Sequence, residues 1–197
     1  MEEKIKNLTF IVILGFIIMF ILIIGLYFKD GTTTTETTNK GTSGGSATSD
    51  TEYDVSEMNE VDLEEAVALF DEKGTHVLYM GRSACTYCRQ FVPVLNEVQE
   101  DLGFTTNYLD VNTIANIWNS QKKNTDEGKA LLKQVKELTD KITIEATANG
   151  EKGKLGDLFV ENGFTPATIV IKDGKVVEGF FGYRNAETLT ELLEKYL

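Results

Sequence analysis

Hydrophobic positions along the chain follow two different patterns. Residues 8–28 form a continuous apolar run of 21 residues without a charge, in which Thr9 is the single polar side chain. A helix of that length spans roughly 31 Å at about 1.5 Å per residue, which matches the hydrocarbon core of a bilayer. Beyond residue 58, apolar positions recur at helix or strand spacing, as in a soluble domain. The pattern predicts a short N-terminal segment (1–7), a transmembrane anchor (8–28) and a folded domain (53–197).

A removable signal peptide is the alternative to an anchor. The apolar part of a signal peptide usually has about 7–15 residues and ends at a small-residue cleavage site. Here the run ends in Gly25-Leu26-Tyr27-Phe28-Lys29, which lacks such a site. Aromatic residues beside a lysine are typical of a membrane interface, and the lysines around the run slightly favour a cytoplasmic N-terminus. We therefore expect a single-pass protein of the cell membrane with an extracytoplasmic C-terminal domain.

Residues 29–52 connect the anchor to the domain. This segment is rich in Thr, Gly and Ser, and it has no large apolar side chain between residues 31 and 50. Such a composition cannot bury enough apolar surface to offset the entropy of ordering the chain. We expect a flexible tether.

In the remaining residues, helix and strand patterns alternate. The expected helices cover residues 58–72, 85–102, 155–162 and 186–197, and the expected strands cover 76–80, 104–111, 168–171 and 176–181. The sequence Asp173-Gly174 between the last two strands predicts a tight hairpin turn. Residues 113–150 are expected to form a helical insertion, which either packs on its own domain or presents a surface to a partner. Strands that alternate with helices indicate an α/β fold with a mainly parallel sheet and an antiparallel edge.

Composition narrows the possible functions of this domain. Residues 51–197 carry 15 basic and 26 acidic side chains, a net charge of −11, within a chain whose net charge is −12. A domain so acidic, without a basic run, is a poor candidate for binding nucleic acid. The chain has two cysteines and one histidine, which excludes a disulfide-dense scaffold and disfavours catalysis that depends on histidine.

The two cysteines form the motif Cys85-Thr86-Tyr87-Cys88, between an apolar strand and the start of a helix. Free N–H groups and the dipole at a helix N-terminus stabilise an anion there. Such surroundings lower a thiol pKa from about 8.5 to roughly 3.5–7.5, so the first cysteine becomes a nucleophile at neutral pH. The second cysteine lies one helical turn further and can resolve a mixed disulfide.

Two structural interpretations compete with redox chemistry. A zinc half-site would need four Cys or His ligands, whereas the chain offers two cysteines and His76, with carboxylates or a second chain to complete the set. A structural disulfide across such a short loop would contribute little to the stability of a fold this size. The strand, motif and helix arrangement favours a redox pair, and no metal site is predicted.

The sequence also resembles the thioredoxin-like proteins beyond the cysteines. Pro93 lies eight residues after Cys85, where that family has the proline of its active-site helix. Pro166, in the sequence Gly163-Phe164-Thr165-Pro166-Ala167-Thr168 before an apolar strand, resembles the family's cis-proline segment, and the two glycines that follow at spacings of eight and sixteen residues match as well. The anchor and insertion are similar to thioredoxin-like proteins of the bacteriocin transport accessory type.

The resemblance implies a fold and a set of roles. The fold would be a central mixed sheet with helices on both faces and a helical insertion. Cys85 would attack and Cys88 would resolve, whereas Thr86, Tyr87, Thr165 and Pro166 would contact the substrate. One departure matters: the position six residues before the first cysteine, where thioredoxins have a buried aspartate that assists proton transfer, is occupied by Tyr79. A tyrosine with a pKa near 10 is a poor base at neutral pH.

Together these features predict a tethered thiol–disulfide oxidoreductase. Its partners would be the thiols and disulfides of exported proteins or peptides, a dithiol protein that exchanges electrons with it, and the membrane through its N-terminal helix. No organic cofactor is required, and no nucleic acid is expected. The alternatives are a metal-binding or metallochaperone module, and a non-catalytic adaptor of a secretion system in which the cysteines are incidental.

Overall fold

The computed structural model describes residues 53–118 and 120–197. The predicted N-terminal segment, anchor and tether, residues 1–52, lie outside the described residues. Within the described ranges, no helix has the length and apolar character needed to cross a membrane.

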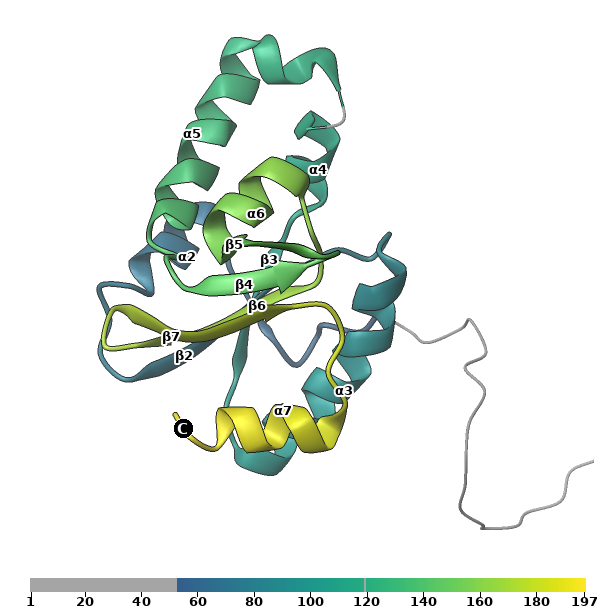
Figure 1. Cartoon of the computed structure of the whole chain (residues 1–197), viewed down its shortest axis with the longest axis vertical. Helices are drawn as coiled ribbons and strands as arrows, with labels where there is room; N and C mark the ends of the chain where they lie inside the picture. Colours follow the sequence, from purple (N-terminus) through teal and green to yellow (C-terminus); the bar gives the residue numbers. More distant parts are fainter. Residues whose placement is uncertain (1–52, 119) are drawn as a thin grey trace, which may run out of the picture. The chain divides into compact units, whose positions relative to one another are not determined.

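A five-stranded mixed sheet forms the centre of the domain (Figure 1). Its strand order is β1-β3-β2-β6-β7, in which β1, β3 and β2 run parallel and the β2–β6 and β6–β7 pairs are antiparallel. The bounds are β1 Asn59–Glu60, β2 Thr75–Gly81, β3 Thr106–Asp110, β6 Ala167–Lys172 and β7 Lys175–Phe181. The expected mixed sheet is therefore confirmed, with β2 at its centre.

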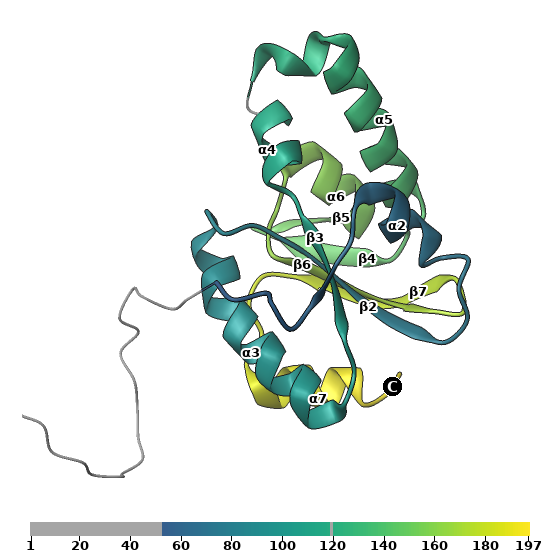
Figure 2. The ribbon, with the colours of Figure 1, turned by 180° about the vertical axis from the view of Figure 1, so that it is seen from behind.

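Helices cover both faces of this sheet. On one face lie α3 (Thr86–Leu102) and α7 (Ala186–Leu193), and on the other lie α2 (Leu63–Ala68), α4 (Asn112–Trp118), α5 (Asp126–Asp140) and α6 (Leu155–Asn162) (Figures 1 and 2). Side chains alternate along β2, so Val77 and Tyr79 join the core beneath α3 and α7, whereas Leu78 and Met80 join the opposite core. The sheet thus separates two apolar cores, and the helices on both of its faces agree with the fold that the family resemblance implied.

The predicted helical insertion is helical only in part. Residues 113–140 hold α4, the 3-10 helix η1 (Gln121–Asn124) and α5, but the chain then forms the hairpin of β4 (Glu145–Ala148) and β5 (Glu151–Lys154). The expectation of helix over 145–150 was wrong because Asn149 and Gly150 both take positive φ, at 49° and 85°, and form a tight turn. Within α5, Val135 and Leu138 are buried in the domain's own core.

Two predicted helices are also shorter than expected. The first begins only after Asp62, whose side chain accepts the Glu65 N–H at 2.9 Å while the Glu65 carboxylate accepts the Asp62 N–H at 2.9 Å, a capping box. The last ends at Leu193, because the chain then turns so that the Tyr196 carbonyl accepts hydrogen bonds from Thr75 and Lys172 at 2.8 and 3.0 Å.

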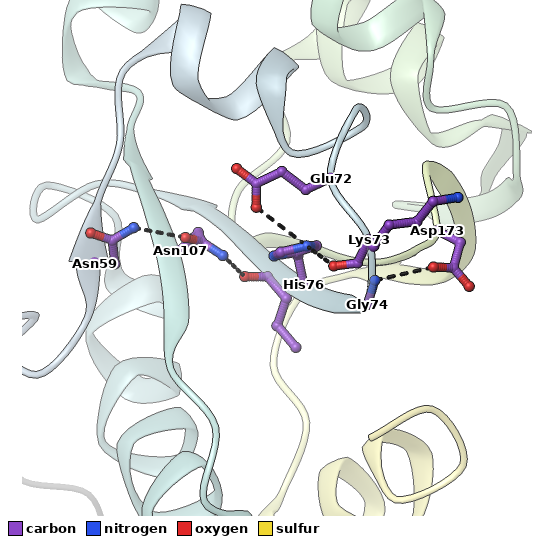
Figure 3. A network of polar contacts seen from close by, with 8 residues as sticks. Asn59, Glu72, Lys73, Gly74, His76, Asn107 and Asp173 are labelled. Carbon is purple, nitrogen blue, oxygen red and sulfur yellow. Dashed lines mark hydrogen bonds and ion pairs between the residues drawn. The ribbon is translucent and has the colours of Figure 1, made fainter.

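Polar side-chain contacts connect the first residues of β2 to adjacent segments of the chain (Figure 3). Asn59 donates to the Asn107 side-chain oxygen at 2.9 Å, and Asn107 donates in turn to the Val77 carbonyl at 3.3 Å. His76, considered above as a zinc ligand, lies instead 3.5 Å from the Glu72 carboxylate. These side-chain contacts lie at the beginning of β2, whereas its opposite end leads to the cysteines.

Candidate active site

The Cys85 sulfur caps the helix that carries both cysteines. Strand β2 ends at Gly81, and after a short loop Cys85 occupies the N-cap of α3 with extended backbone angles, φ −90° and ψ 121°. Its Sγ accepts the N–H of Cys88 at 3.3 Å, as a serine or aspartate oxygen does at other helix starts. The motif therefore places a polarisable sulfur against unpaired helix N–H groups.

This position favours the thiolate of Cys85. Its pKa falls from 9.0 to about 5, chiefly because the Cys88 thiol donates a hydrogen bond to it. A hydrogen bond with the Thr165 side chain and the backbone N–H groups of Cys88 and Tyr87 lower the pKa further, while partial burial opposes them. With a pKa of about 5 the Cys85 thiol is ionised at neutral pH, and because the residue is only half-buried its sulfur can be reached from solvent.

Cys88 has the opposite character. Its side chain is 0% exposed, and its hydrogen bond to Cys85 together with burial raises its pKa. It therefore stays a protonated thiol beside an ionised one. This asymmetry is what a nucleophile and a resolving thiol require.

The loop that contains Thr165 and Pro166 lies next to Cys85 and completes the site. The Thr165–Pro166 peptide bond is cis, as the family resemblance implied. The Cys85 Sγ lies 3.5 Å from the Thr165 carbonyl oxygen, and Gly182 donates its N–H to the Pro166 carbonyl at 2.8 Å. Residues 80 positions apart in the chain thus meet where β2 ends and β6 begins.

The chain has a thioredoxin-like fold. What decides this is the mixed sheet with helices on both faces, together with a Cys-x-x-Cys helix start that faces a cis-proline loop.

Several solved structures of thioredoxins are similar to this domain. The thioredoxin-like domain is similar to thioredoxin of Plasmodium falciparum (18% identity, 71% of this chain and 100% of that chain, TM-score 0.43). It is also similar to mitochondrial thioredoxin 3 of Saccharomyces cerevisiae (15%, 71% and 96%, TM-score 0.42) and to a mutant thioredoxin of Halobacterium salinarum (16%, 77% and 96%, TM-score 0.40). No protein family matches the sequence, and no curated protein sequence does.

The remaining predicted site residues differ in how far they are exposed. Thr86 is exposed, and the Tyr87 side chain is 63% exposed, so both can meet a bound partner. Thr165 and Arg82 line a cavity of about 300 Å³ between α4 and α6. Pro166 is buried. In the described ranges, no group of three or more His, Cys, Asp or Glu side chains is arranged to hold a metal ion.

Sequence reasoning missed the aromatic group beneath the cysteines. Tyr79 is fully buried, its ring stacks on Tyr108 with centroids 5.6 Å apart, and its hydroxyl lies 3.5 Å from that of Tyr53. The spacing to Cys85 identified Tyr79 as a departure from the family pattern, but no local signal links it to Tyr53 or Tyr108. Only the parallel pairing of β2 with β3 brings the Tyr79 and Tyr108 rings together.

Proposed function

We propose that this protein is a thiol–disulfide oxidoreductase whose nucleophile is Cys85. The observation that carries the proposal is the Cys85 sulfur at the N-cap of α3, with its pKa lowered to about 5 and a protonated cysteine one turn behind it. An adaptor in which the cysteines are incidental would not need an ionised sulfur at this position. The Thr165 backbone beside it, where a substrate segment can lie, supports the same conclusion.

The reaction follows from the two unlike thiols. The Cys85 thiolate attacks a substrate disulfide, forms a mixed disulfide and releases one substrate thiolate. Cys88 then loses its proton and attacks Cys85, which closes the Cys85–Cys88 disulfide and releases the second substrate thiolate. The substrate disulfide gains two electrons, which the protein dithiol loses; in the reverse direction, a substrate dithiol is oxidised by the same steps.

The substrates we propose are exported proteins or peptides. The Thr165 backbone beside Cys85 suits an extended segment, captured through its main chain in the manner of a strand, and the exposed Tyr87 offers an aromatic surface next to it. The predicted anchor would hold the domain at the outer face of the membrane, where a bacteriocin precursor is a suitable substrate. A dithiol partner protein would restore the redox state of the pair.

Substitution of the cysteines tests the activity directly. Cys85→Ser should abolish disulfide exchange with a model peptide disulfide, because no other described thiol is ionised and accessible. Cys88→Ser should still attack but should stall as a mixed disulfide that mass spectrometry detects on Cys85. Ser83→Ala, at an exposed position of the loop before the motif, controls for local disturbance of the loop. Full exchange activity in Cys85→Ser would overturn the proposal.

A further inference from the structure

The resolving step poses a problem of proton transfer. Cys88 must lose its proton before it attacks, yet it is fully buried and its pKa is raised. The carboxylate that assists in thioredoxins is replaced by Tyr79. A route for the proton must therefore use groups that lie against the buried thiol.

Two phenols form a path from that thiol towards solvent. The Tyr79 hydroxyl is a hydrogen-bond partner of the Cys88 sulfur, and this contact lowers the Cys88 pKa, whereas the hydrogen bond to Cys85 and burial raise it. The same hydroxyl lies 3.5 Å from the Tyr53 hydroxyl, in a contact where either atom can donate. Tyr79 is 0% exposed, whereas Tyr53 is only half-buried. Thiol, buried phenol and half-buried phenol thus follow one another in the right order.

The backbone leaves room for this arrangement. A methyl group built on Gly81 would collide with the Tyr79 hydroxyl. Glycine at this position, two residues further along β2 on the same face, allows the phenol to reach the thiol. The stacked Tyr108 ring and the tilted Phe91 ring, with centroids 5.6 and 6.0 Å from that of Tyr79, hold the phenol in place.

We propose that Tyr79 and Tyr53 relay the proton of Cys88 to solvent during the resolving step. This inference deepens the proposed oxidoreductase function and rests on it. As the Cys88 sulfur attacks Cys85, its proton moves to the Tyr79 oxygen, the Tyr79 proton moves to Tyr53, and the Tyr53 proton leaves to water. Both phenols are neutral before and after. The S–S bond to the substrate breaks, the Cys85–Cys88 bond forms, and the departing substrate thiolate takes a proton from solvent.

A relay of this kind removes the objection that tyrosine is a poor base. Neither phenol has to hold a negative charge, because each accepts one proton as it gives up another. The titratable neighbours of the path are Cys85 beside Cys88, and Tyr108 beside Tyr53; Glu60 and Asp110 act on Tyr108. Burial first, and then these two carboxylates, raise the pKa of Tyr108 and so keep it neutral too.

The test separates the two chemical steps. The reduced full-length chain is mixed with excess dithionitrobenzoate, an aromatic disulfide that releases a coloured thiolate. Attack by Cys85 gives a first release that depends on reagent concentration, and resolution by Cys88 gives a second release that does not. Tyr79→Phe and Tyr53→Phe each remove a relay hydroxyl, and Tyr196→Phe, which removes a phenol that contacts the Val177 carbonyl, is the matched control.

Tyr79→Phe should slow the second release by about 100-fold, the lower end of what positioned proton transfer contributes, and leave the first release unchanged. The logarithm of its rate should rise with pH at a slope near one, because only the spontaneously formed thiolate can attack, whereas the wild type should show a shallower slope. Tyr53→Phe should change rate and slope in the same direction, and Tyr196→Phe should change neither.

Three results would overturn the relay. They are an unchanged second release in Tyr79→Phe, a wild-type second release in Tyr53→Phe, and a loss in Tyr79→Phe that is the same at every pH, which would indicate a structural role. Absence of the first release in the wild type would instead contradict the proposed function. The two ideas therefore fail in distinguishable ways.

Discussion

At the scale of single residues, two cysteines three positions apart have opposite acid–base behaviour. The spacing predicts that both lie on the first turn of a helix, but it does not distinguish their surroundings. Cys85 is the N-cap and receives hydrogen bonds, whereas Cys88 is inside the turn, buried, and donates one. The resolving thiol therefore helps to ionise the attacking thiol before it takes part in the chemistry itself.

A pair of variants should reveal this assistance. Cys88→Ala removes the donor that contributes most to the low pKa of Cys85, so that pKa should rise well above about 5. Cys88→Ser keeps an O–H donor at the same position and should raise it less. The pH dependence of alkylation by iodoacetamide measures the pKa of Cys85 in each protein. The explanation fails if Cys88→Ala titrates like the wild type.

At the scale of elements, short turns decide where strands and helices end. Gly103 ends α3 with φ 69°, and Gly174, in the β6–β7 turn, has φ 79°. Both need the left-handed region that glycine enters at low cost. They differ in surroundings, since a methyl group on Gly103 would meet open space while one on Gly174 would collide with the Phe70 carbonyl.

The two glycines provide a matched comparison of backbone strain with steric collision. Gly103→Ala should lower the free energy of unfolding by about 1–2 kcal/mol, the cost of a left-handed L-residue. Gly174→Ala should cost about 1–3 kcal/mol more, because the turn must also move away from Phe70. Urea unfolding of the reduced proteins measures both. Equal losses in the two variants would show that the predicted collision is relieved without cost.

At the scale of the whole molecule, the ionised thiol links folding to pH. The pKa of Cys85 is about 5 in the folded protein against 9.0 for the free group. Because the folded value is the lower one, the stabilisation is fully present above about pH 9 and is lost as the pH falls through about 5. The raised pKa of Cys88 acts in the opposite sense only above the pH at which a free thiol ionises.

The reduced wild-type protein should therefore gain stability relative to Cys85→Ser as the pH rises from about 5 to about 9. Denaturant unfolding at several pH values, with reductant present, gives the difference between the two proteins. Contributions of groups that do not interact with Cys85 cancel in that difference, whereas the pKa of Cys88 depends on Cys85 and changes with the substitution. A difference that stays constant across this range would mean that the folded domain does not favour the thiolate.

Much of this molecule could be predicted from local patterns, and the failures have physical reasons. Strands β2, β3, β6 and β7, the helix start at Cys85 and the Asp173-Gly174 turn follow from periodicity and turn residues, and the central mixed sheet was implied by the family resemblance. The hairpin at Asn149-Gly150 was missed, although Asn-Gly is itself a turn signal, because the helical pattern before it dominated the interpretation. The predicted helix over 58–72 was too long, because pairing of β1 with β3 competes for its first residues.

The candidate site also contains residues that the sequence predicts and residues that it does not. Cys85, Cys88 and the cis-proline segment belong to short motifs that can be recognised in the sequence alone. The tyrosine group could not be predicted, because Tyr53, Tyr79 and Tyr108 are brought together by strand pairing and by the chain that precedes β1. Contacts between distant segments require the topology, which a single sequence does not specify.

The alternation along β2 has a consequence for how such a protein can change. Tyr79 belongs to the core with the dithiol, and its neighbour Leu78 belongs to the other. One residue added within this strand would carry the phenol through to the far side and bring a leucine beneath Cys88. A residue added in the loop that precedes Thr75 would leave this alternation unchanged, whereas the seven-residue strand itself must keep its register.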